Sequence, residues 1–361
     1  MDTNNNTEQE ETEAFNEALD PFVADITSLN IVDISSGAEA DEVSMALAWF
    51  REAIYYNLPH GKRNRGLAVV MTHKILSEHF KQRPDLERAR MVGWCIEMLQ
   101  THFLILDDIM DESLTRRGQK CWHLKKNVGN IAINDSFFMQ QTIFYVLKKH
   151  FINCAYFTDL LTLLFDTMLR TTMGQCLDLK SSAKPGEVPD LEKFTTDKYN
   201  AIIDYKTSFY SFSAPVRLGM IISGLLDPSL HRKADVILRK MGKLFQVQDD
   251  YLDCFGDPVI MGKIGTDIEE GKCCWPIVTA LSLANEKQRV ILEQNYARRE
   301  KHNQEAIVKV YRELNIEAIY KQFEVDAVLE LRGLIDKFSN ETQIPGEIFY
   351  SMLLKICGRN R

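Results

Sequence analysis

Two aspartate clusters combine closely spaced carboxylates with apolar surroundings. The first ends the stretch LQTHFLILDDIMD at 99–111, and the second ends QVQDDYLD at 246–253. Residues four apart share one face of a helix, so the outer aspartates of each DDxxD cluster can act together. The six carboxylates are those of Asp107, Asp108, Asp111, Asp249, Asp250 and Asp253.

These carboxylates need partners, because removing several of them from water uncompensated costs several kcal/mol or raises their pKa values. Hard oxygen ligands suit Mg²⁺, which usually binds one or two carboxylates together with substrate phosphates. The alternative interpretation is a pair of solvated acidic helix ends. The apolar flanks and the basic loop after each cluster argue against it, and the spacing excludes an EF-hand. The pattern therefore indicates Mg²⁺ ions bridged by a diphosphate.

Several cations near these clusters could complete a diphosphate site. Taken singly, each is more simply a solvated surface charge, but Arg116, Arg117 and Lys263 adjoin the acidic motifs in loops and are favoured for phosphate. The full set is Lys62, Arg65, Arg116, Arg117, Lys206, Lys263 and Lys272.

The elements that must position these groups are helices. Apolar residues recur at steps of three and four in most segments, and no alternating strands are evident. Gly- and Pro-containing loops separate about ten or more such runs. The pattern predicts an all-α protein with a single catalytic domain over 16–361, preceded by a disordered acidic tail over 1–15.

Composition narrows the function classes. A net charge of −8 disfavours a general nucleic-acid or anionic-membrane surface. The eight cysteines contain no CxxC pair, which indicates reduced thiols rather than a zinc site or a disulfide framework. No apolar run approaches the roughly 20 residues that span a bilayer. The N-terminus lacks the features of a secretory or organellar targeting segment, so we expect a cytoplasmic protein without stable membrane insertion.

The motifs resemble those of the short-chain trans-isoprenyl diphosphate synthases, and most of all the farnesyl diphosphate synthases of animals. The resemblance runs from about residue 40 to the C-terminus. It rests on DDIMDESLTRRGQ at 107–119, AIND at 132–135, GQCLDL at 174–179, YKTSFYSF at 205–212, FQVQDDYLDCFGDP at 245–258 and GKIGTDIEEGKC at 262–273.

The resemblance implies the isoprenoid synthase fold, a helical bundle around a deep cavity, usually as a homodimer. It implies a prenyltransferase that condenses isopentenyl diphosphate with dimethylallyl or geranyl diphosphate. The product would be farnesyl diphosphate, or geranyl diphosphate, formed through an allylic carbocation. It further implies three Mg²⁺ ions per active site, with Mn²⁺ or Co²⁺ as alternatives.

The same resemblance assigns roles to individual residues. All six aspartates would bind Mg²⁺, and Asp107, Asp108, Asp111, Asp249, Arg116, Lys206 and Lys263 would carry the catalysis. The allylic diphosphate would be held by Arg116, Lys206, Thr207, Gln246, Lys263 and Lys272. Isopentenyl diphosphate would be held by Gly61, Lys62, Arg65, Gln100 and Arg117.

Three places depart from the family pattern. His60 stands where a first glycine is usual; a glycine there often permits a φ that histidine disfavours, and we interpret the histidine as tolerated. Ser213 replaces a common aromatic, and the nearby Arg217 is interpreted as facing solvent.

The third departure is His102 with Phe103, where the family generally carries two aromatics that set product length. By helical pitch Phe103 lies roughly 40° from the Asp107 face, and His102 about 140° from it. Pitch therefore assigns the chain-length floor to Phe103. His102 is either a pocket residue or a histidine that packs between helices.

Two further hypotheses compete with chain elongation. A terpene synthase on this scaffold would need the aspartates but not the isopentenyl site, and the changed His60 and His102 keep that alternative open. The intact Lys62 and Arg65 favour elongation. Two complete acidic motifs argue against a non-catalytic regulatory subunit.

Overall fold

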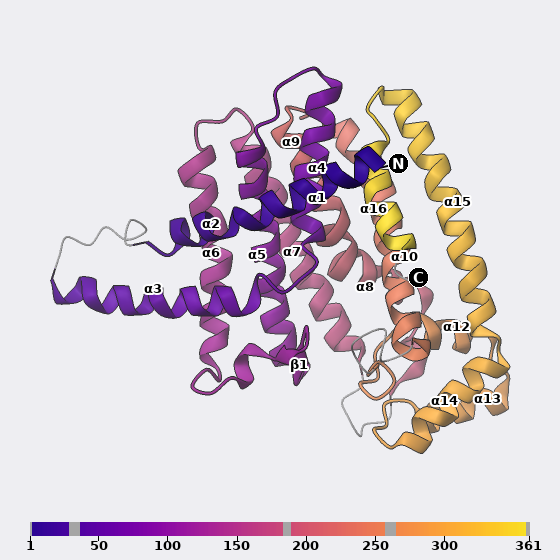
Figure 1. Cartoon of the computed structure of the whole chain (residues 1–361). Helices are drawn as coiled ribbons and strands as arrows, with labels where there is room; N and C mark the ends of the chain where they lie inside the picture. Colours follow the sequence, from indigo (N-terminus) through magenta and orange to yellow (C-terminus); the bar gives the residue numbers. More distant parts are fainter. Residues whose placement is uncertain (1, 29–36, 183–188, 257–264, 359–361) are drawn as a thin grey trace. The chain divides into compact units, whose positions relative to one another are not determined.

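The computed structural model describes residues 2–28, 37–182, 189–256 and 265–358, and nearly all of these are helical (Figure 1). Within those ranges the only strands, β1 (Thr115–Arg116) and β2 (Gln119–Lys120), pair as one short antiparallel hairpin. The all-α prediction is therefore confirmed.

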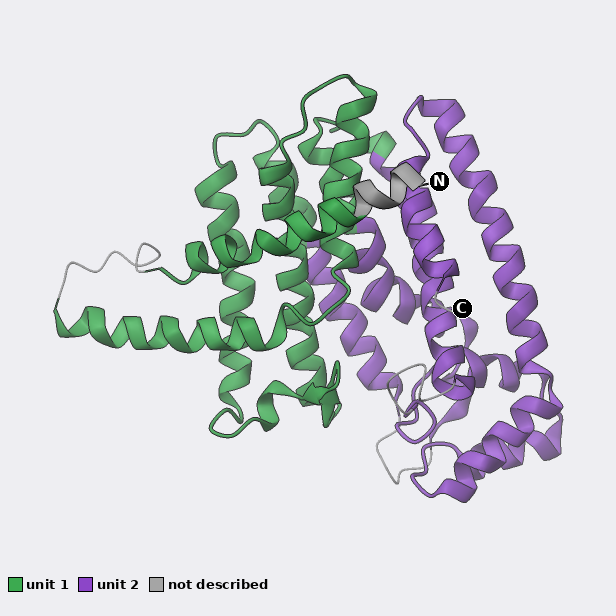
Figure 2. Ribbon diagram, in the orientation of Figure 1, with its two compact units in different colours: residues 1–165, 214–230 green, residues 166–213, 231–361 purple. Residues whose placement is uncertain are grey.

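The chain forms two compact units, coloured separately in Figure 2. Unit 1 comprises residues 1–165 and 214–230, and unit 2 comprises residues 166–213 and 231–361. Unit 1 contains α1 (Asp2–Glu17), α2 (Leu19–Ile26), α3 (Ala38–Asn57), α4 (Asn64–His79), α5 (Leu86–Met110), the hairpin, the 3₁₀ turn Trp122–Leu124, α6 (Ile131–Phe151) and α9 (Ala214–Ile222).

Helix α7 (Phe157–Ser181) begins in unit 1 and continues into unit 2, as does α10 (Pro228–Phe255). The remainder of unit 2 is the 3₁₀ turn Leu191–Lys193, α8 (Thr196–Ile202), the π-helical segment η4 (Ile203–Ser213), α12 (Trp275–Leu283), α13 (Glu286–Asn295), α14 (Lys301–Glu313), α15 (Ile316–Thr342) and α16 (Glu347–Cys357). The single catalytic domain over 16–361 stays a prediction.

Helix α5 is the centre of unit 1 and packs against α4 and α6. Trp94, Cys95 and Ile96 project at successive steps of about 100° around this helix, yet none of the three is exposed. A helix that is apolar all round must be covered all round, and the neighbouring helices supply that cover. Helix α9 approaches α4 so closely that a Cβ on Gly219 would lie 2.6 Å from Cβ of Thr72.

Two residues of the segment predicted to be a disordered tail over 1–15 make long-range contacts, and the extent of that tail stays a prediction. Phe15 stacks on Trp94 with ring centroids 4.4 Å apart, and the Trp94 indole donates to the Phe15 carbonyl at 3.0 Å. Glu11 is buried and accepts from Lys74 at 3.3 Å and from Arg90 at 2.9 Å. The polar composition predicted disorder because these long-range partners are not visible locally.

The core of unit 2 is built around aromatic residues. Tyr251 of α10 stacks on Tyr320 of α15 with ring centroids 3.8 Å apart, and Trp275 of α12 meets Tyr320 edge-on at 6.1 Å. Tyr296 and Tyr311 are fully buried in the same cluster. This packing fixes the C-terminal end of α10, which carries the second acidic motif.

Buried histidines make unit 1 sensitive to acid. In α4, Nε2 of His73 accepts the backbone N–H of Asp85 at 3.0 Å, so Nδ1 carries the proton and donates to Ser223 Oγ at 2.9 Å. Burial lowers the pKa of His73, although the nearby Asp85 charge opposes this. The unfolded chain therefore binds the proton more readily, and stability is lost as the pH falls.

We expect the free energy of unfolding to decline as the pH drops below about 6.5, the ordinary histidine pKa. Urea unfolding at several pH values measures this decline. His73→Gln should flatten the profile, whereas the matched change at an exposed histidine, His302→Gln, should leave it unaltered. A His73→Gln profile as steep as the wild type would contradict the assignment.

Candidate active site

The first acidic motif lies at the C-terminal end of α5, and Asp111 caps the helix by donating its N–H to the Asp107 carbonyl at 2.8 Å. The last carbonyls of a helix carry partial negative charge. Three carboxylates at that end add to this charge rather than offsetting it. The location therefore requires a cation, and the loop that follows supplies one.

That cation is Arg116. It lies in a tight β-hairpin that brings its side chain back to the first acidic motif. Arg117 and Gly118 both have positive φ, 53° and 76°, and lie between the paired residues Arg116 and Gln119. This is the two-residue turn with positive φ at both central positions that suits β-hairpins, and glycine favours it.

Arg116 holds the first two aspartates with its guanidinium. Nε and Nη2 donate to Asp108 Oδ1 at 2.9 and 2.5 Å, and Nη2 reaches Asp107 Oδ2 at 3.3 Å. Burial opposes the charge on Arg116, but the hydrogen bond and the charges of Asp108 and Asp107 outweigh it and raise the pKa of Arg116. Asp108 is buried beneath this contact, while Asp107 and Asp111 are half-buried.

Gly61 and Arg117, two of the predicted isopentenyl-diphosphate residues, are in contact. Arg117 Nη1 donates to the Asn57 carbonyl at 3.2 Å, and a Cβ on Gly61 would lie 2.7 Å from Arg117 Nη2. Because Gly61 has no side chain, the Arg117 guanidinium has room to lie against the backbone there. His60 is exposed and does not have a positive φ, so the substitution leaves this contact intact.

Glu97 positions the start of α4 and was missed by the sequence analysis. Its Oε1 accepts the backbone N–H groups of Arg65 at 3.0 Å and Gly66 at 2.8 Å, which caps a helix that has no side-chain cap of its own. Arg65 is half-buried and Lys62 is exposed. One feature of the sequence could have predicted this role: Glu97 is a charged residue within an otherwise apolar helical run, three residues before Gln100.

Gln100 is buried in α5, and no described group donates a hydrogen bond to its Oε1. A buried amide oxygen without a partner is costly in a folded protein and often marks a ligand or water site. This observation agrees with the predicted role of Gln100 in binding a substrate.

His102 packs between helices. It is buried, its Nδ1 lies 2.9 Å from the Ser136 carbonyl of α6, and its ring centroid is 5.8 Å from that of Phe137. Because a carbonyl only accepts, Nδ1 carries a proton, and burial lowers the pKa of His102. This favours the packing interpretation over the pocket role, so the predicted chain-length role stays with half-buried Phe103 as an expectation.

The other departures lie in buried surroundings. Ser213 is buried, and its hydroxyl donates to Asp235 of α10. Arg217 is half-buried on α9, so the expectation that it faces solvent is only partly met.

In unit 2, two predicted diphosphate lysines converge on one carboxylate. Lys206 Nζ of η4 lies 2.5 Å from Asp178 Oδ2 of α7, and Lys272 Nζ lies 3.5 Å from the same oxygen. Burial alone would raise the pKa of Asp178, but the two ammonium groups lower it overall. Asp178 belongs to the GQCLDL motif, to which the sequence analysis gave no individual role.

Gln246 and Thr207, also predicted to bind the allylic diphosphate, are joined in a chain of hydrogen bonds. Thr207 Oγ1 donates to Gln246 Oε1 at 2.9 Å, and Gln246 Nε2 donates to Asp250 Oδ1 at 2.8 Å. Both groups are therefore oriented by α10 itself.

The Asp250 carboxylate accepts three hydrogen bonds from other groups of the protein. Besides Gln246, its carboxylate accepts from the Tyr199 hydroxyl at 2.6 Å and the Trp275 backbone N–H at 2.8 Å. Burial raises the pKa of Asp250 to about 6, although these three hydrogen bonds act in the other direction. The carboxylate ties α10 to α8 and α12, an arrangement that does not fit the predicted metal-ligand role of Asp250.

Asp249 and Asp253 lie one turn apart, on a different face of α10 from Asp250. Asp253 Oδ1 accepts the backbone N–H of Asp267 at 3.0 Å. The predicted diphosphate ligand Lys263 lies outside the described residues. Among the residues that are described, no three His, Cys, Asp or Glu side chains group closely enough to hold a metal ion.

The carboxylates nevertheless suit Mg²⁺. Asp107 and Asp111 end a helix whose dipole disfavours anions, and Asp249 and Asp253 repeat the same spacing on α10. Hard, partly exposed oxygens of this kind bind Mg²⁺ and leave coordination positions for phosphate.

Comparisons with known proteins agree with this geometry. A model of the polyprenyl synthetase family matches residues 47–314. The chain is 42% identical to the farnesyl pyrophosphate synthase of Schizosaccharomyces pombe, over 96% of this chain and 97% of that protein. It is 44% identical to the Bos taurus farnesyl pyrophosphate synthase, over 89% and 90%.

A solved Trypanosoma brucei farnesyl diphosphate synthase in complex with risedronate superposes with a TM-score of 0.85 and 27% identity, covering 97% of this chain and 100% of that one. The all-α architecture is thus the isoprenoid synthase fold, as the motifs predicted. The family model over residues 47–314 and the relatives that match most of the chain show that this chain belongs to the polyprenyl synthetase family.

Proposed function

We propose that this protein is a prenyltransferase of the farnesyl diphosphate synthase type. It condenses isopentenyl diphosphate with dimethylallyl and then geranyl diphosphate to give farnesyl diphosphate. The observation that carries the proposal is the first acidic motif with Arg116 folded back onto it, together with the two lysines that converge on Asp178. The relatives named above act as support, because they match nearly the whole chain.

The proposed metal ligands are Asp107, Asp111, Asp249 and Asp253, with Asp108 and Asp250 in supporting positions. Bound Mg²⁺, three ions per active site, would neutralise the diphosphate and favour its departure from the allylic carbon. Arg116 keeps Asp108 and Asp107 in place, and Asp178 keeps Lys206 and Lys272 together for the same leaving group.

The chain's own residues then control the carbocation. Lys206, Lys272 and Gln246 would bind the departing diphosphate, and an oxygen of that diphosphate would accept the proton lost after the new C–C bond forms. Thr207 and apolar walls would exclude water, which would otherwise capture the cation. Gly61, Lys62, Arg65, Gln100 and Arg117 would hold isopentenyl diphosphate, and Phe103 would limit the product length.

A terpene synthase is not favoured. Such an enzyme has no need for an isopentenyl-diphosphate site, whereas here Gly61 still seats Arg117 and Glu97 still caps the helix that begins beside Arg65.

The deciding experiment incubates the protein with Mg²⁺ and dimethylallyl diphosphate, with and without isopentenyl diphosphate, and separates the products by chain length. We expect C15 diphosphate only when both substrates are present. Lys62→Ala should reduce condensation at least about 100-fold, because a charged diphosphate contact is lost. Hydrocarbon or alcohol formed from one prenyl diphosphate alone, and unaffected by Lys62→Ala, would refute the proposal.

We further propose that the protein acts as a homodimer in the cytoplasm. Phe165, Leu169 and Met173 repeat every four residues along α7 and are 51%, 62% and 48% exposed. Such an apolar stripe on a helix is typical of an interface. No described helix combines the length and apolar character that crossing a bilayer requires.

Leu169→Asp should shift the protein from dimer toward monomer, weakening self-association at least about tenfold by burying a charge in an apolar contact. Light scattering across a dilution series measures the change. Asp159→Asn, an exposed site on the same helix, is the control. A Leu169→Asp protein that associates like the control would place the interface elsewhere.

A further inference from the structure

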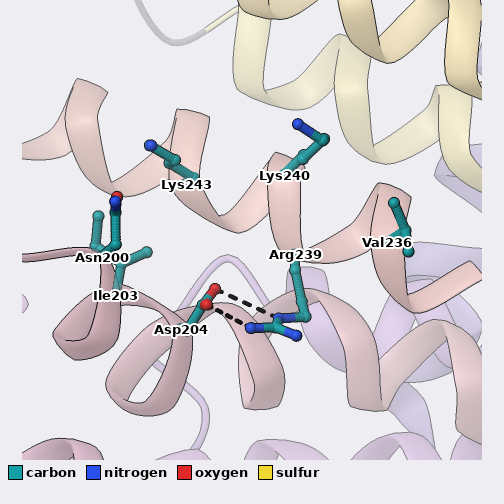
Figure 3. Close-up of a pocket in the computed structure, with 7 residues that line it drawn as sticks. All are labelled: Asn200, Ile203, Asp204, Val236, Arg239, Lys240 and Lys243. Carbon is teal, nitrogen blue, oxygen red and sulfur yellow. Dashed lines mark hydrogen bonds and ion pairs between the residues drawn. The ribbon is translucent and has the colours of Figure 1, made fainter. Parts of the chain in front are cut away.

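A cavity of about 330 Å³ opens in unit 2, where α8 and η4 meet α10 (Figure 3). Its volume is at the lower end of the range for small-molecule sites. The lining carries three cations and one carboxylate, together with an asparagine and two apolar side chains. These residues are Asn200, Ile203, Asp204, Val236, Arg239, Lys240 and Lys243.

Two of the three cations already have partners. Arg239 donates to Asp204 through both Nε and Nη2, as the dashed lines in Figure 3 show. Lys240 Nζ lies 2.7 Å from Glu330 of α15. Lys243, by contrast, forms no hydrogen bond or ion pair with the residues that the structure describes. The cavity therefore presents one uncompensated positive charge.

One residue that lines the cavity also carries an unmet hydrogen-bond acceptor. The Oδ1 atom of Asn200 is buried, and no described group donates to it. An unsatisfied buried polar atom destabilises a folded protein. In Figure 3 the Asn200 amide points toward the side of the cavity on which Lys243 lies. A ligand that satisfies both groups offers an anionic oxygen to Lys243 and a hydrogen-bond donor, such as an O–H, to Asn200 Oδ1.

We propose that this cavity binds inorganic phosphate or a hydroxyl-bearing phosphate ester. Phosphate near neutral pH combines anionic oxygens with a hydroxyl, and Ile203 and Val236 could contact the carbon part of an ester. The site is distinct from the lysines on Asp178, because Asp204 and Lys206 are two residues apart and face different sides of η4. The proposal does not depend on the prenyltransferase activity.

Isothermal titration of the full chain with inorganic phosphate, at low ionic strength and without Mg²⁺, tests the site. Lys243→Gln should weaken phosphate binding about tenfold, the effect expected for a lost hydrogen bond to a charged group. Lys233→Gln is the matched control, since this lysine lies on α10, pairs with Glu341 and does not line the cavity. Phosphate bound at any other site contributes equally to all three proteins.

Sulfate separates the two parts of the site, because it is an anion of similar shape without an O–H at neutral pH. We expect wild-type protein to prefer phosphate over sulfate and Asn200→Leu to lose that preference, while Lys243→Gln weakens both anions. Equal phosphate affinity in wild type and Lys243→Gln, or no phosphate binding by the wild type, would overturn the proposal.

Discussion

Asp107→Asn should lower kcat/KM for condensation by about 10³-fold while leaving the thermal stability close to that of the wild type. Asp107 is half-buried at the end of α5 and accepts a hydrogen bond from Arg116 Nη2 at 3.3 Å, longer than those that Arg116 makes to Asp108. The amide keeps the shape of the side chain but removes the charge that a divalent metal requires. The Mg²⁺ concentration needed for half-maximal activity should rise in parallel.

Two comparisons make this result specific. Glu112→Gln removes an exposed carboxylate from the same loop and should retain full activity. Asp108→Asn should lower stability as well as activity, because Asp108 is buried and accepts both Nε and Nη2 of Arg116. If Asp107→Asn lost stability to the same extent as Asp108→Asn, Asp107 would be a structural residue rather than a metal ligand.

Asp178→Asn should produce the second large effect, with kcat/KM for the allylic substrate falling about 100-fold and unfolding free energy falling by about 3 kcal/mol. Without the carboxylate, Lys206 and Lys272 become neighbouring positive charges with no shared anion. Their repulsion should move the ammonium groups apart and separate them from the positions that bind diphosphate. Steady-state kinetics and urea unfolding measure the two changes.

A double variant distinguishes electrostatics from packing. Asp178→Asn combined with Lys272→Gln removes the repulsion, so it should regain part of the stability without regaining activity. Asp159→Asn, an exposed change on the same helix, should behave as wild type. Wild-type kinetics in Asp178→Asn would show that the two lysines keep their positions without it.

The helical class and the family could be predicted from the sequence, since both depend on patterns within short segments. The DDxxD spacing places two carboxylates on one helix face wherever the helix lies. Likewise, Arg117 and Gly118 suit a tight turn, which returns Arg116 to Asp107 and Asp108 only eight or nine residues away.

The partners of single side chains were decided by the tertiary structure. Asp249 and Asp250 are adjacent and look equivalent in the sequence. Asp250, however, is buried and accepts hydrogen bonds from Tyr199 and Trp275, which are distant in sequence. From the sequence, His102 could have lined a pocket or packed between helices. Its hydrogen bond to the Ser136 carbonyl of α6 favours packing between helices.

The N-terminal segment shows the same limit, because its composition alone predicts disorder while Phe15 and Glu11 find partners in α4 and α5. The sequence by itself therefore determined the fold class and the chemistry of the acidic motifs, since periodicity and charge spacing are local. Only the tertiary structure decided which carboxylates meet cations and which meet the backbone, because hydrogen bonds and burial depend on residues brought together by folding.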